Sequence, residues 1–160
     1  MSNTFVLTSD CDHLLGDEHI KILRLLADNG IFITTAVFNK VVIDDSWLGR
    51  HCSPKDTDGW SDNERYKSGL IEAKAMGHEV AFHGASQISN TRNQFLKGIE
   101  EYNDVFGEYP FTYIEHGPNP YHHSGLGYKK ELLNFGAEEG DEFYIKDVVK
   151  DVFKLTWTQD

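Results

Sequence analysis

The chain has 160 residues, of which 39% are hydrophobic and 26% are charged, and a formal net charge of −11. This length and composition are typical of a globular protein with one core, so we expect a single domain over residues 1–160. The negative charge argues against nucleic-acid and anionic-membrane partners and favours a neutral small-molecule or glycan substrate.

The sequence also bears on the compartment. No basic region with an apolar segment follows Met1, and no apolar run approaches the roughly 18 residues of a membrane-spanning helix. Cys11 and Cys52 are too few for a disulfide framework. We therefore expect a cytoplasmic protein with reduced thiols and no membrane contact.

An Asp-x-Asp pair follows the first apolar run. Residues 5–7 predict a short buried strand, and Asp10 and Asp12 come after it, where the carboxyl end of a strand meets an active site in α/β folds. Side chains two residues apart on an extended segment point the same way, so both carboxylates can face one cation. Cys11 between them should point into the core. The alternative is that Asp12 or Asp17 caps the following helix.

The next elements have clear start and stop signals in the sequence. Residues 17–29 predict a helix with acidic residues in its first turn and Gly30 after its end. Residues 31–38 are β-branched and aromatic and predict the second strand. Residues 40–59 predict a long loop with a short element near residues 41–43.

The next helix and strand again end in a side chain that can bind a metal. Ser61 and Glu64 predict a capping box at the start of a helix that Gly77 ends. Residues 79–82 predict the third strand, and His83 directly after it is a candidate metal ligand.

The rest of the chain repeats the alternation. Residues 90–106 predict a helix and residues 110–114 a fourth strand, after which His116 is a candidate ligand, acid–base group or loop anchor. The loop that follows holds His122 and His123, which we expect at the surface. The remaining elements are a helix over residues 129–135, a helix over 143–153 and a strand over 154–158. Strands that alternate with helices predict an α/β fold with a parallel sheet or barrel.

These phrases resemble a known family. Residues 8–12 read Thr-x-Asp-x-Asp, residues 33–38 read Ile-Thr-Thr-Ala-Val-Phe, and residues 77–83 read Gly-His-Glu-Val-x-x-His. In this order they are similar to the polysaccharide deacetylases of the NodB-homology group (carbohydrate esterase 4), over about residues 5–117. The resemblance implies an irregular (β/α) barrel, incomplete here, and the hydrolysis of acetyl groups from a sugar or polysaccharide precursor.

The resemblance also implies roles for individual residues. Asp10 would be the general base, and Asp12 and His83 would bind a divalent ion, zinc in the first instance. His116 or Gln87 would supply a third ligand, and His116 is the candidate general acid if it is not a ligand.

The chain departs from the family pattern at three points. Gln87 stands where the family has a second histidine, and the fourth strand ends in Glu115, His116, Gly117 and Pro118 instead of Arg-x-Pro. No late motif with a general-acid histidine precedes Asp160. The chain would thus be a divergent or truncated member.

Two other classes fit some of the same residues. A non-catalytic carbohydrate-binding relative would keep the fold without turnover. A haloacid-dehalogenase phosphatase would use Asp10 as nucleophile with magnesium, and Asp141 and Asp147 as its later acidic motif. Candidate aromatic platforms for a sugar ring are Trp47, Trp60, Tyr113 and Tyr121.

Overall fold

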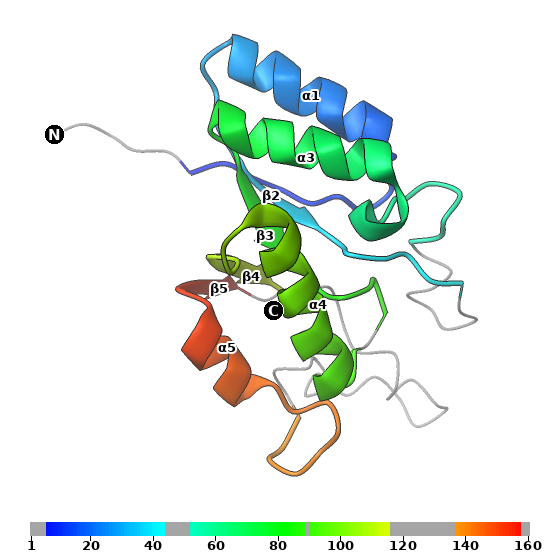
Figure 1. Ribbon diagram of the computed structural model, residues 1–160, viewed down its shortest axis with the longest axis vertical. Coiled ribbons are helices and arrows are strands. Elements are labelled where there is room, and N and C mark those ends of the chain that lie inside the picture. Colours follow the sequence, from blue (N-terminus) through cyan, green and yellow to red (C-terminus); the bar gives the residue numbers. More distant parts are fainter. Residues whose placement is uncertain (1–5, 44–51, 89, 116–136, 158–160) are drawn as a thin grey trace, which may run out of the picture.

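A computed structural model describes residues 6–43, 52–88, 90–115 and 137–157 (Figure 1). Five parallel strands form one sheet in the order β1-β2-β3-β4-β5, and the sheet curls into a half-barrel that is compatible with an incomplete barrel. The strands are β1 (Thr8–Ser9), β2 (Thr34–Val37), β3 (Glu79–Phe82), β4 (Thr112–Ile114) and β5 (Leu155–Trp157). The predicted α/β fold with a parallel sheet is therefore confirmed.

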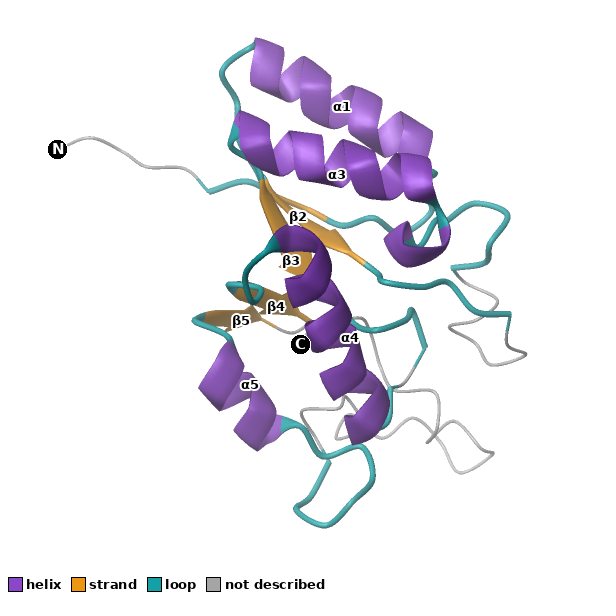
Figure 2. Cartoon of the chain, viewed as in Figure 1, coloured by secondary structure: helices purple, strands orange, loops and turns teal. Residues whose placement is uncertain are grey.

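The helices alternate with the strands along the chain (Figure 2). They are α1 (Gly16–Asp28), α3 (Glu64–Met76), α4 (Arg92–Phe106) and α5 (Lys146–Val152), with the 3₁₀ helix η1 (Trp60–Asp62) ahead of α3. Each α-helix lies within a few residues of its predicted position. The helix predicted over residues 129–135 lies outside the described residues. None of the helices described is long and apolar enough to cross a membrane.

Two local predictions are wrong. Val6 and Leu7 are 77% and 51% exposed instead of buried; they precede β1, which lies at the edge of the sheet that the described residues form. The cap of α3 is Asn63, whose side chain accepts the Tyr66 N–H, whereas Ser61 lies inside η1. Both serine and asparagine are good caps, so the choice depends on where the preceding turn ends.

The core lies between the sheet and its helices. Val37, Val80, Phe82 and Tyr113 belong to one buried apolar cluster. The helical residues of that cluster are Ile20 and Leu23 of α1, Tyr66, Leu70 and Ala73 of α3, Phe95, Ile99 and Tyr102 of α4, and Val148 and Val149 of α5. The four helices thus cover the same face of the sheet.

The opposite face carries small and polar residues. Ala36, Ala81 and Ile114 form a separate small cluster there. Since side chains alternate along a strand, Phe38 and His83, two residues beyond Ala36 and Ala81, fall on this same concave side. Their rings stack with centroids 4.5 Å apart. This alternation places His83 on the inner side of the curled sheet, at the carboxyl ends of the strands.

Candidate metal centre

Asp10, Asp12 and His83 converge at the carboxyl ends of β1 and β3. His83 Nε2 lies 3.1 Å from Asp10 Oδ1 and 4.0 Å from Asp12 Oδ1. One ligand atom from each of the three residues lies within 4.8 Å of the others, so together they could hold a metal ion. The sequence predicts that Asp10, Asp12, His83 and His116 converge; the first three do, and His116 lies outside the described residues.

The ring of His83 is held in one orientation. Its Nδ1 donates to the Ile114 carbonyl oxygen over 2.7 Å, and the side chain is 1% exposed. A carbonyl oxygen only accepts, so Nδ1 carries a proton, and Nε2 is the ring atom that faces the two carboxylates. Histidines that bind metals usually donate their other ring nitrogen in this way to a carbonyl or carboxylate. The donor set and its orientation therefore fit a divalent cation.

The two carboxylates differ in exposure and in their distance from His83. The side chain of Asp10 is 37% exposed, and that of Asp12 is 21% exposed. The Asp12 N–H also donates to Asp10 Oδ1 over 3.3 Å, which orients the first carboxylate from the backbone of the second. Asp10 is thus the carboxylate with more access to solvent and to an incoming molecule.

The helix-capping alternative for Asp12 does not hold. The N-cap position of α1 is Leu15, which makes no side-chain cap, and the Gly16 N–H donates to Asp58 Oδ2 over 2.7 Å. Asp17 instead forms an ion pair with Arg65, 2.8 Å apart. The cap comes from a distant loop, so Asp12 is left to face the concave side with His83.

That loop packs against the turn that follows the centre. His13 has a positive φ of 58°, its N–H donates to Thr57 Oγ1 over 3.1 Å, and its Nδ1 lies 3.0 Å from Asp56 Oδ2. The His13 contact lowers the pKa of the Asp56 carboxyl. Together with Asp58 on Gly16, these contacts fix residues 13–16 directly after the ligands. Sequence reasoning missed Asp56 and Asp58; the run of three polar residues that ends in Asp58 was the only local signal.

Gln87 has a structural role. It is buried, its Oε1 accepts the Val42 N–H over 3.0 Å, and its Nε2 donates to the carbonyls of Val42 and Cys52 over 2.7 and 3.1 Å. The amide therefore ties together two backbone segments that are ten residues apart in the chain. This corrects the sequence-based expectation that Gln87 could be the third metal ligand.

Both cysteines are buried, as predicted for Cys11, and neither forms a disulfide within the described part of the chain. Burial raises the pKa of the Cys11 thiol well above its usual range, and the charges of Asp10 and Asp12 raise it further. Burial, followed by the neighbouring Asp12, also raises the pKa of Cys52. A raised pKa disfavours the thiolate, which is the form that binds metals and attacks substrates.

The remaining candidate site residues from the sequence are three histidines and four aromatic residues. His116, His122, His123, Trp47 and Tyr121 lie outside the described residues. Trp60 and Tyr113 are buried in the core, so the prediction that they are sugar platforms is wrong.

Asp141 and Asp147, the later acidic motif of the phosphatase alternative, form hydrogen bonds away from Asp10. Asp147 accepts two hydrogen bonds of 2.6 Å from the guanidinium of Arg92, and Asp141 Oδ1 accepts the Phe143 N–H over 2.8 Å. Among the described residues, the grouping that could hold a metal contains Asp10 but neither of these carboxylates.

Comparisons of the chain with models of protein families, with curated proteins and with solved structures gave no significant match.

Proposed function

We propose that the chain is a metal-dependent hydrolase that removes acetyl groups from a sugar or a polysaccharide precursor. The observation that carries the proposal is the position of His83, whose Nε2 faces Asp10 and Asp12 while Nδ1 donates to a backbone carbonyl. The phrases that resemble the NodB-type deacetylases, residues 8–12 and 77–83, supply all three side chains. In this proposal the curled sheet is an incomplete barrel of that type.

Asp12 and His83 would hold the ion, with zinc as the metal, because imidazole nitrogen and carboxylate oxygen are common zinc donors. His116 would be the third protein ligand. It follows Ile114, whose carbonyl holds His83, by two residues in the sequence. When bound, the ion would polarise the acetyl carbonyl and increase the acidity of water at the site.

Asp10 would act as the general base. Its carboxylate is the more exposed of the pair and accepts a proton from the water that attacks the acetyl carbon. The bond from that carbon to the sugar nitrogen or oxygen then breaks, and the proton passes to the leaving amine or alcohol. His116 is the candidate proton donor if it is not a ligand. Acetate and the deacetylated sugar are the products.

One observation favours a second candidate, a non-catalytic carbohydrate-binding relative. Gln87 stands where the resembling family has a ligand, and here its amide is engaged with the backbone of Val42 and Cys52. A chain that has exchanged a ligand for a structural amide could keep sugar binding without turnover.

Acetate release decides between the two. Zinc-loaded protein is incubated with N-acetylated and O-acetylated sugars, beside the variant Asp10→Asn and the control Asp62→Asn, an exposed position in η1. We expect acetate from the wild type and the control, and loss of at least 100-fold in turnover with unchanged zinc content in Asp10→Asn. Sugar binding without acetate from any substrate would support the binding relative instead.

A further inference from the structure

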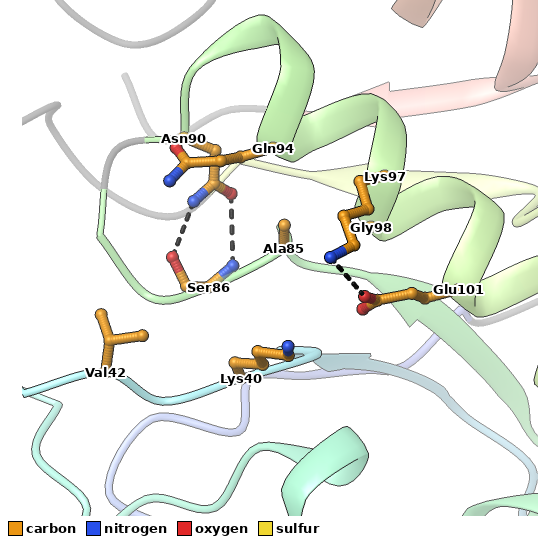
Figure 3. A pocket seen from close by; sticks show the side chains of 9 residues that line it. All are labelled: Lys40, Val42, Ala85, Ser86, Asn90, Gln94, Lys97, Gly98 and Glu101. Atoms are coloured by element: carbon orange, nitrogen blue, oxygen red, sulfur yellow. Dashed lines mark hydrogen bonds and ion pairs between the residues drawn. The ribbon is translucent and has the colours of Figure 1, made fainter.

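A small cavity lies beside α4, where the chain leaves β2 and β3 (Figure 3). Its volume is about 180 Å³. Lys40 and Val42 line it from the segment after β2, and Ser86 lines it from the segment after β3. The opposite wall is α4, which contributes Gln94, Lys97 and Glu101.

Two lysines face this cavity in a chain with a net charge of −11. Lys97 Nζ lies 3.8 Å from Glu101 Oε1, which partly offsets its charge. Lys40 is half-buried, and within the described part of the chain its ammonium forms no ion pair. A partly desolvated ammonium without a counter-charge favours an anionic group beside it.

The backbone under Lys40 is fixed from two sides. Its N–H donates to the Ala85 carbonyl over 3.1 Å, and the two segments form an isolated parallel bridge at Lys40 and Ser86. On the other side, a Cβ on Gly59 would come within 2.5 Å of the Lys40 Cα, so only glycine allows this close approach. The backbone from which the Lys40 side chain extends is therefore fixed at the cavity wall before any ligand binds.

The neutral polar groups of the cavity leave donors available. Ser86 Oγ accepts from Asn90 Nδ2 over 2.7 Å, so its own hydrogen can be donated elsewhere. Gln94 Oε1 accepts from the Thr91 N–H and hydroxyl over 2.8 and 3.1 Å, which leaves the amide NH₂ as the available part of that side chain. Hydroxyl, amide and ammonium donors together match the acceptor oxygens of a carboxylate or phosphate.

We infer that this cavity binds the carboxylate or phosphate group of an acidic sugar. The inference rests on the proposed function. Both features belong to the same edge of the sheet: Ser86 follows His83 by three residues, and Lys40 follows Phe38, which stacks on His83, by two. A volume of about 180 Å³ lies below the roughly 300–1,000 Å³ of pockets that enclose a whole ligand, so it suits one charged group.

The test measures binding to metal-free protein, so that the cavity is probed apart from the metal centre. Glucuronate, glucose 6-phosphate and glucose are titrated into the wild type by calorimetry. We expect one charged sugar to bind at least tenfold more tightly than glucose, and the tighter one identifies carboxylate or phosphate as the group recognised. We expect Lys40→Gln to weaken that binding at least tenfold and Lys40→Arg to keep most of it. Lys146→Gln, at an exposed lysine on α5, should bind as the wild type does.

The inference fails if neither charged sugar binds more tightly than glucose, or if Lys40→Gln binds as tightly as the wild type. Circular dichroism checks that the variants fold, and Lys97→Gln provides a second variant from the other wall. Lys40-dependent binding in a protein that releases no acetate would support the cavity and contradict the deacetylase proposal. Acetate release without Lys40-dependent binding would support the deacetylase proposal and contradict the inference about the cavity.

Discussion

His83 Nδ1 donates to the Ile114 carbonyl oxygen over 2.7 Å, so the strand β4 orients a candidate ligand that follows the neighbouring strand β3. The bond uses backbone alone on the acceptor side, and so it needs no particular side chain at position 114. It makes the direction of the imidazole a property of the parallel sheet. The candidate centre is therefore built into the fold at this point.

The first prediction concerns metal content. His83→Ala removes the one nitrogen donor among Asp10, Asp12 and His83, so we expect zinc affinity to fall by about 100-fold or more, since losing even an outer partner of a ligand costs 10–100-fold. Asp62→Ala, at an exposed position in η1, is the control. Elemental analysis and competition with a chelator measure both. Equal zinc affinity in wild type and His83→Ala would contradict the metal centre.

The second prediction concerns Gln87. Replacing it with Leu leaves the Val42 N–H and two backbone carbonyls without the amide, and an unsatisfied buried polar group costs about 1–3 kcal/mol. We expect the free energy of unfolding, from urea titration, to fall by that order. Gln87→His tests the other role: if position 87 reached the metal, histidine would tighten zinc binding, and we expect no tightening.

Local sequence signals were sufficient where an element is defined by its own ends. Gly77 stops α3 in the left-handed conformation with φ of 115°, and the apolar run after it is β3, so the position of His83 followed directly. Asp10 and Asp12 were found for a similar reason, because two carboxylates after a strand have few structural uses.

The errors come from contacts between distant parts of the chain. Whether Leu7 is buried depends on which segments lie beside the first strand, and among the described residues β1 pairs with β2 alone. The partners of Gln87, Val42 and Cys52, lie 45 and 35 residues away, and the cap of α1 is Asp58, which lies 42 residues from Gly16. No periodicity or short motif encodes such pairings.

The third prediction concerns this cap. Asp58→Ala removes the acceptor of the Gly16 N–H at the start of α1, and losing a helix cap typically costs about 1 kcal/mol. Asp58→Asn keeps an oxygen acceptor and should lose less. Asp62→Ala, an exposed acidic position in η1, serves as control and should leave the urea midpoint unchanged. Equal stability of Asp58→Ala and wild type would mean that water replaces the cap without cost.

The buried histidine of α1 gives the last prediction. His19 lies between two hydroxyl groups, with Nδ1 2.7 Å from Tyr66 Oη and Nε2 2.7 Å from Thr35 Oγ1. Burial, followed by the charge of His78, lowers the pKa of His19 from 6.5 to about 4. Below pH 6.5 the unfolded chain therefore binds a proton that the folded protein does not, so stability falls as the pH falls from 6.5 towards 4.

A difference of about 2.5 pKa units corresponds to roughly 3 kcal/mol lost across that window, because each unit is worth 1.36 kcal/mol. His19→Gln lacks the titrating group, so its stability should change less with pH than that of the wild type. Urea unfolding at pH 7.5, 6.0 and 5.0 measures both proteins. Lys146→Gln, at an exposed position on α5, should retain the wild-type slope over the same range. Parallel pH profiles for wild type and His19→Gln would show that His19 is not the group whose protonation destabilises the fold.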